Sequence, residues 1–230
     1  MNPIAFLPLT SMVVSLTFAG FVLRHYLQHH HTQLLLWGVG MVFYGIGSAS
    51  EAYYGLLGWN PTVFRLWYLF GAILVAAWLG QGTVYLLAKK RTANILMGVL
   101  GLASIYALVA VFNARLDPTL ISASELSGKA ITSPGVRLLT PFFNLYGTLT
   151  MVGGALYSSV LFWRKRVLLH RVIGNVLIAA GAIMPAFGGT FSRLGIPGAL
   201  YISELLGAVV LFIGFLRAST PIESKVEVYA

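Results

Sequence analysis

Long apolar stretches with almost no charged residue alternate with short polar segments along this chain. Each stretch has about the 20 residues that an α-helix needs to cross the hydrocarbon core of a bilayer. The pattern predicts an all-α, polytopic membrane protein with seven transmembrane helices, followed by a polar tail at 218–230. Because the stretches are continuously apolar rather than alternating, they do not fit the strands of a transmembrane β-barrel. The predicted spans are residues 3–23, 34–54, 62–88, 92–113, 141–163, 172–191 and 199–217.

The densest group of cations falls between the fifth and sixth predicted spans. The segment Trp163–Arg171 carries four of them. By contrast, residues 138–163 before it and residues 172–192 after it carry no formal charge. The segment predicts a tight hairpin at one membrane face, with Trp163 as an interfacial anchor.

Lysine and arginine are unequally divided between the two sets of connections. Short loops rich in these residues face the cytoplasm, so the N-terminus is expected outside and the C-terminus in the cytoplasm. One set holds five, at Arg65, Arg115, Lys129, Arg137 and Arg193. The other set with the tail holds ten, at Arg24, Lys89, Lys90, Arg91, Arg164, Lys165, Arg166, Arg171, Arg217 and Lys225.

The amino-acid composition also indicates a membrane protein and limits the partners that it could bind. Of 230 residues, 58% are hydrophobic and 9% are charged, against about 25% charged in ordinary soluble domains. The net charge of +9 lies in short loops, which favours anionic lipid rather than nucleic acid as the partner. The chain contains no cysteine, which excludes disulfides. Its start has no basic segment before the first apolar stretch, so this stretch is expected to be retained in a bacterial inner membrane.

Glu51 and Glu204 are the acidic residues that fall within or at the edge of predicted spans, both toward the outer side. A charge in a membrane is costly and suggests function; Arg65 and Arg193 lie at the same level and could pair with them. A small-ligand pocket is therefore predicted at the outer half of the bundle. Its polar and aromatic wall would come from Tyr53, Tyr54, Trp67, Tyr68, Asn144, Tyr146 and Tyr201. The alternative is that the aromatic residues form an interfacial belt and the charged pairs only join helix ends.

Two further features could contribute to function. Pro185, in the sixth span, predicts a kink that serves either as a hinge or as a fixed bend. The run His29–His31 resembles a metal-binding tract or pH sensor, although an interfacial cap of the first span is the favoured interpretation because no carboxylate or cysteine is near in sequence.

Enzyme signatures are absent from the sequence. It has neither His-Glu-x-x-His nor Gly-x-Ser-x-Gly, which are the motifs of zinc proteolysis and of serine hydrolases. A retinal-type Schiff base would need a lysine within the bundle, and all five lysines fall in loops or the tail. No catalytic residue, metal or cofactor is therefore expected.

Two parts of the chain resemble a known sensor family. Residues 34–51 with Phe64–Gly71, and Arg171–Gly195 with its Gly181 and Pro185, are similar to the bacterial seven-helix sensor region at the N-terminus of some histidine kinases and diguanylate cyclases. The resemblance implies a ligand-sensing input domain. Those regions feed a cytoplasmic catalytic domain, whereas about 13 residues follow the last span here, so signalling would require a protein partner.

Three functions follow from these observations. The first is a non-enzymatic receptor or sensor whose ligand contacts Glu51, Arg65, Arg193 and Glu204. The second is a small-molecule transporter of three-plus-one-plus-three helices, since Phe70–Val75 echoes Leu206–Leu211 as an internal repeat would. The third is an accessory subunit of a larger membrane complex.

Overall fold

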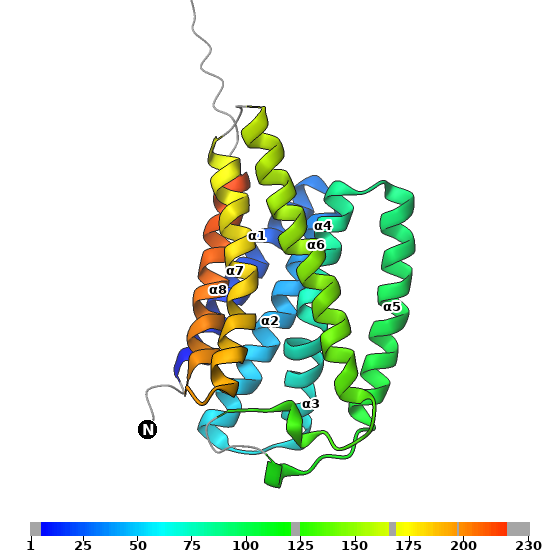
Figure 1. The fold of residues 1–230 in the computed structure, drawn as a ribbon, viewed down its shortest axis with the longest axis vertical. Coiled ribbons are helices and arrows are strands. Elements are labelled where there is room, and N and C mark those ends of the chain that lie inside the picture. Colours follow the sequence, from blue (N-terminus) through cyan, green and yellow to red (C-terminus); the bar gives the residue numbers. More distant parts are fainter. Residues whose placement is uncertain (1–5, 121–124, 166–168, 197, 220–230) are drawn as a thin grey trace, which may run out of the picture.

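The computed structural model describes residues 6–120, 125–165, 169–196 and 198–219, without the side chain of Arg193. Long helices run side by side in one bundle (Figure 1). The elements are α1 (Phe6–His29), α2 (Thr32–Leu57), α3 (Pro61–Leu66), η2 (Trp67–Leu74), α4 (Val75–Leu87), α5 (Lys90–Phe112), η3 (Pro118–Leu120), η4 (Gly128–Ala130), α6 (Val136–Arg164), α7 (Leu169–Arg193) and α8 (Ala199–Ser219).

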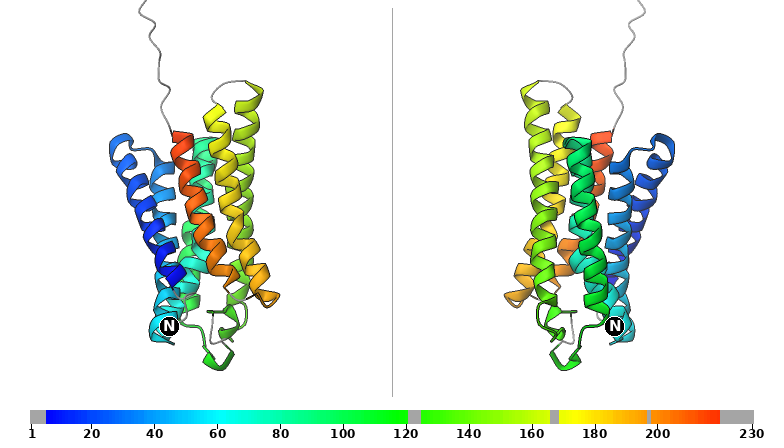
Figure 2. Two further views of the ribbon diagram at one scale, coloured as in Figure 1. Left: turned by 90° about the vertical axis from the view of Figure 1, so that its left-hand side faces the viewer. Right: turned by 90° about the vertical axis from the view of Figure 1, so that its right-hand side faces the viewer.

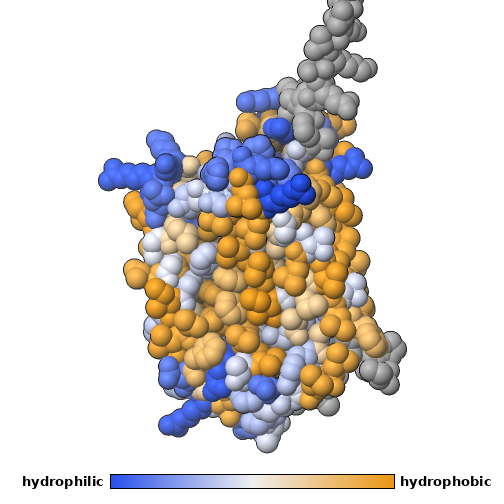
Figure 3. All heavy atoms as spheres, turned by 180° about the vertical axis from the view of Figure 1, so that it is seen from behind, coloured by the Kyte–Doolittle hydropathy of each residue, from blue (hydrophilic) through white to orange (hydrophobic). Residues whose placement is uncertain are grey.

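Seven helical segments are long and apolar enough to cross a membrane, as the sequence predicted. The third of them, Pro61–Leu87, is continuous through α3, η2 and α4. On the face drawn in Figure 3, apolar residues form a belt across the middle of the molecule, with polar residues above and below it. The chain is a multi-pass membrane protein by this architecture.

The bundle has two different ends (Figures 1 and 2). The loop end contains the start of α1, the turn before Pro61 and the connections 113–135 and 194–198. The basic end contains the α1–α2 and α4–α5 turns, the end of α6 and the end of α8. The first and last helices therefore place their outer termini at opposite ends. At the basic end, α6 ends at Arg164 and α7 begins at Leu169; residues 166–168 of the predicted hairpin at 163–171 lie outside the described residues.

Glycines bring α7 and α8 into backbone contact. A Cβ added at Gly181 would lie 2.7 Å from the backbone nitrogen of Leu211, and one at Gly174 would lie 2.6 Å from that of Ala218. Small residues of this kind let helices approach closely in lipid, where packing replaces the hydrophobic drive. By contrast, α5 lies at the edge of the bundle (Figure 1), and added Cβ atoms at its Gly98 and Gly101 would meet nothing within 4 Å.

Two details depart from the sequence expectation. α6 begins at Val136, five residues before the predicted span, with Pro141 inside the helix. Pro141 is the sixth residue of α6, beyond the first four positions whose N–H groups lack partners in the helix, so it removes one backbone hydrogen bond of the helix. The third span also widens into a π-helix at Trp67–Leu74, a rare conformation that occurs frequently at functional sites.

Candidate functional site: an acidic cluster beneath the loop end

Glu51 is buried within the bundle six residues before the end of α2. Only 2% of it is exposed, and its Oε1 accepts a hydrogen bond from the indole Nε1 of Trp67 at 2.8 Å. Its other oxygen, Oε2, is buried and accepts no hydrogen bond of good geometry from the described residues. A buried carboxyl group with one unpaired oxygen carries a desolvation cost that a further partner would remove.

Glu204 brings a second carboxyl group to the same place. It lies five residues into α8, and its side chain interacts with that of Glu51. Tyr44 of α2 donates a hydrogen bond of 2.7 Å to the main-chain oxygen of Glu204, which fixes α8 against α2. The two acidic residues that the sequence singled out are therefore neighbours, although they stand 153 positions apart.

The described parts of the connection between α5 and α6, residues 113–120 and 125–135, lie over this pair and are called the lid below (Figure 1). Its two arms are joined by an antiparallel bridge between Leu116 and Ile131. Glu125 of the lid is buried, and its Oε1 accepts a hydrogen bond of 2.8 Å from the backbone N–H of Gly198, at the start of α8. Ser192 of α7 donates to the other oxygen of Glu125. The lid is thereby attached to the α7–α8 turn.

Glu125 belongs electrostatically to the same cluster, since it interacts with both Glu51 and Glu204. The buried ring of Tyr201 stands within this group and its phenol hydrogen-bonds with the backbone of Leu126. The acidic site is defined here as Glu51, Glu125 and Glu204, with the aromatic side chains of Tyr44, Trp67 and Tyr201 around them.

Close backbone contact between α2 and η2 positions Trp67 for its bond to Glu51. A Cβ added at Gly47 would lie 2.9 Å from the Cα of Gly71, so only glycines allow the two helices to approach this closely. On the opposite side of η2, the amide of Asn144 donates to the carbonyl of Ala72 at 3.0 Å. The π-helical segment is therefore held from two sides, and its first residue faces the carboxyl group.

Other residues predicted for the pocket lie outside this cluster. Arg65 donates to the main-chain oxygen of Ala114 at 3.1 Å rather than to Glu51. Tyr68 accepts a hydrogen bond from Thr140 at 2.9 Å, and its ring packs beneath Gly128 of the lid. Asn144 donates to the carbonyl of Ala72 in η2, as described above. The side chain of Arg193 lies outside the described residues, so its predicted pairing with Glu204 stays a prediction.

Glu125 and Tyr44 contribute to the site although the sequence did not point to them. Glu125 bonds to residues 67 and 73 positions away, so its local sequence carried no sign of burial. The only available signal was its place in the one connection long enough to fold back over the bundle. The role of Tyr44 was harder still to predict, because an aromatic residue within an apolar span is typical of any membrane helix.

Pro185 and the histidine run keep their predicted roles as untested interpretations. Pro185 is inside α7, and a Cβ added at Gly207 of α8 would lie 3.2 Å from its Cδ. The rings of His25, His29 and His31 lie near one another, with centroids 5.9 and 6.1 Å apart along the series. Among the described residues, no group of three His, Cys, Asp or Glu side chains is arranged to hold a metal ion.

Two hollows in the structure lie away from the acidic site. A cavity of about 30 Å³ in the middle of the bundle is lined by apolar side chains such as Met41, Leu79 and Phe215. A larger, open groove of about 330 Å³ runs between α4 and α6 toward the basic end. Neither is lined by a residue predicted for the outer pocket.

The chain was compared with known proteins in three ways. It matches no family model, no curated protein and no solved structure. The resemblance to bacterial sensor regions therefore stays a prediction, and functional inference rests on the residues of the acidic site.

Proposed function

We propose that this protein is a non-enzymatic membrane receptor or sensor, and that its acidic site binds a small organic cation. The observation that carries the proposal is the pairing of the buried Glu51 with Glu204: their side chains interact with each other, and Oε2 of Glu51 accepts no hydrogen bond of good geometry from the described residues. Among the described residues, neither Glu51 nor Glu204 forms an ion pair. Two adjacent carboxylates in a medium of low dielectric constant repel each other strongly.

A positively charged ligand would remove this repulsion, and an ammonium N–H or a hydroxyl group on the ligand would donate a hydrogen bond to Oε2 of Glu51. A primary or substituted ammonium group suits the site, because the buried rings of Tyr44, Trp67 and Tyr201 lie around the carboxyl groups. Aromatic faces attract cations by about 0.5–2 kcal/mol depending on desolvation. Since the lid covers the site, ligand entry requires the lid to separate from the α7–α8 turn.

The distribution of charge supports an orientation for this receptor. The exposed cations Lys89, Lys90, Arg91, Arg164 and Lys165 lie at the basic end, which the preference of such loops assigns to the cytoplasm. The acidic site would then face the exterior of the inner membrane. This orientation exposes the lid to ligands and the basic loops to anionic lipid and a cytoplasmic protein partner.

A route for signalling runs along α8. Tyr44 bonds to Glu204 in the second turn of α8, and the lid bonds to Gly198 directly before the helix, while its far end lies among the basic loops. Pro185 packs against Gly207 in the middle of the same helix pair, where a hinge would change the angle between α7 and α8. A ligand drives such a shift only if it binds one arrangement more tightly than the other.

The transporter alternative would require a polar path through the bundle. The mid-bundle cavity is small and apolar, and the buried amide of Gln81 is already paired with Tyr146 and with the carbonyl of Ala93. These observations favour a receptor over a transporter.

The proposal is tested by thermal unfolding of the purified protein in mild detergent, with choline and its uncharged isostere 3,3-dimethyl-1-butanol as probes. Choline at 100 times its dissociation constant should stabilise the wild type by about 2.7 kcal/mol, and the alcohol should have no effect. Glu51→Gln and Glu204→Gln should abolish the choline effect. Glu51→Gln retains an oxygen for the Trp67 indole, so folding should be preserved.

The matched control is Asp117→Asn, which neutralises an acidic residue of the lid that lies outside the acidic site and whose carboxyl group accepts hydrogen bonds only from Thr119 among the described residues. It should respond to choline as the wild type does. An equal choline shift in Glu51→Gln would contradict the proposed site. If acidification alone stabilised the protein and choline did not, the acidic site would be a proton sensor rather than a cation receptor.

A further inference from the structure

The groove between α4 and α6 opens because the two helices diverge toward the basic end. They are in backbone contact at Gly147, where an added Cβ would lie 2.6 Å from the backbone nitrogen of Ala77. One turn and a half further along α6, a Cβ added at Gly153 would meet nothing within 4 Å, whereas one added at its neighbour Gly154 would lie 2.4 Å from Cγ2 of Thr83 and 3.0 Å from Cδ1 of Leu87, both in α4. Gly154 thus forms the floor of the groove and Gly153 leaves its opening free.

The walls of the groove are apolar and face outward into the apolar belt. Leu87, Leu149 and Tyr157 line it and are 42%, 65% and 61% exposed. From Leu149 to Tyr157 the α6 wall runs about 12 Å along the helix axis at 1.5 Å per residue. A groove of this length, parallel to the helices of a membrane bundle, lies in the direction of lipid acyl chains.

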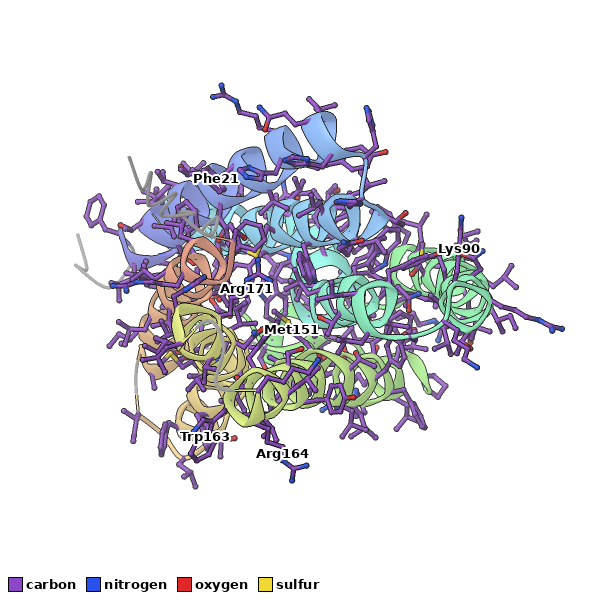
Figure 4. All side chains as sticks on the ribbon, turned by 90° about the horizontal axis from the view of Figure 1, so that it is seen from above. Phe21, Lys90, Met151, Trp163, Arg164 and Arg171 are labelled. Carbon is purple, nitrogen blue, oxygen red and sulfur yellow. The ribbon has the colours of Figure 1, made fainter. Side chains whose placement is uncertain are left out.

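Cations stand at the end of the groove that leads out of the belt. Ala88 lines the groove, and the exposed residues Lys89, Lys90 and Arg91 follow it directly. On the other side, α6 ends at Arg164, which extends away from the bundle (Figure 4). The described residues give none of these cations an acidic partner, since their four acids, Glu51, Asp117, Glu125 and Glu204, all belong to the loop end.

We propose that this groove is a binding site for one anionic phospholipid, with an acyl chain along Gly153 and the headgroup phosphate beside Lys89 and Lys90. Charge complementarity selects the occupant: an apolar groove alone would accept any lipid, whereas a basic rim at the interface favours an anionic headgroup. The site is at the opposite end from the acidic site, so it does not depend on the proposed ligand.

The test is native mass spectrometry of the detergent-purified protein with added dioleoyl-phosphatidylglycerol or dioleoyl-phosphatidylcholine, which share their acyl chains. The wild type should retain the anionic lipid about ten- to thirty-fold more strongly, as expected for two lysines at one headgroup. Gly153→Leu should lower this retention about ten-fold, because its side chain fills the groove. Since Cβ meets open space there, thermal unfolding should stay unchanged.

Two further variants separate the groove from general surface attraction. Gly98→Leu is the matched control, because Gly98 also meets nothing within 4 Å but lies on α5, and it should retain lipid as the wild type does. Lys89→Gln with Lys90→Gln should remove the preference for phosphatidylglycerol. Undiminished retention in Gly153→Leu would overturn the proposal, even if the lysine variant lost its preference, because the groove would then contribute nothing.

Discussion

The two ends of the bundle handle polar groups in opposite ways. At the loop end, Glu51 and Glu125 are buried and accept hydrogen bonds from Trp67, Ser192 and Gly198. At the basic end, Lys89 and its neighbours are exposed. The loop end therefore uses donors from η2, α7 and the α7–α8 turn to hold its carboxyl groups inside, whereas the basic end leaves its cations exposed to water and lipid headgroups.

This difference indicates where specificity and where adaptability reside. Buried polar groups fix one arrangement because each lost partner costs the desolvation of the group left behind. Exposed cations keep their side-chain freedom and contribute little to stability. A site that recognises one ligand is expected at the loop end, and a surface that accepts lipid or a docking partner at the basic end.

The largest expected contrast between the ends concerns their glycines. Gly188→Ala, near the loop end, places a Cβ against Ser203 and 2.8 Å from the carbonyl oxygen of Ala199. Overpacking of this kind should lower the free energy of unfolding by about 1–3 kcal/mol, measured by thermal unfolding in detergent.

The adjacent Gly189→Ala is the control, because its Cβ meets only Leu200 at 4.0 Å. Gly153→Ala provides the comparison at the basic end, where nothing lies within 4 Å. Both should unfold at the wild-type temperature. Equal losses in all three variants would mean that the α7–α8 turn is no more tightly packed than the basic end.

The sequence predicted the seven spans because bilayer thickness imposes a minimum length on each apolar stretch. It also predicted that Glu51 and Glu204 lie at one depth, since each is five or six residues from a span end. What it could not supply was their rotation about the helix axes. Depth follows from counting residues, but a meeting of two side chains depends on which faces pack together.

The same reason explains why contacts around the predicted site could not be anticipated from the sequence. Arg65 lies at the expected level but donates to the carbonyl of Ala114 in the lid. Nothing in the sequence indicates that this backbone oxygen lies within reach of Arg65. The π-helix at Trp67–Leu74 similarly depends on the amide of Asn144 from a helix 72 positions later. Neither partner could be identified before the helices were placed.

A second, smaller contrast lies in the helix caps. At the loop end, Asn60 caps α3 by accepting from the backbone N–H groups of Thr62 and Val63 at 2.9 and 3.2 Å. The N-caps at the basic end, His31 of α2 and Lys89 of α5, form no such bond.

Asn60→Ala should therefore destabilise the protein by about 1 kcal/mol, whereas Lys89→Ala should leave stability unchanged. Thermal unfolding of the two variants measures the difference, and Asn60→Asp, which preserves the acceptor oxygen, should restore the wild-type value. Equal stability of Asn60→Ala and wild type would show that the loop end does not depend on this cap.

The smallest expected effect concerns a titratable group on the surface of the lid. Hydrogen bonds from the hydroxyl and the backbone N–H of Thr119, at 2.6 and 3.0 Å, hold the pKa of Asp117 below its ordinary value. A carboxyl group with a lowered pKa contributes stability above its unfolded-state pKa, and that contribution is lost as the pH falls through its folded-state pKa.

Thr119→Val removes the larger of the two causes, so the pKa of Asp117 should rise toward its ordinary value, which a carboxyl ¹³C NMR titration measures. Because Asp117 is exposed to solvent in the lid, the choline response of the acidic site should not change. A pKa of Asp117 that stayed the same in Thr119→Val would mean that this bond does not form in solution, and that order at the loop end is confined to its buried groups.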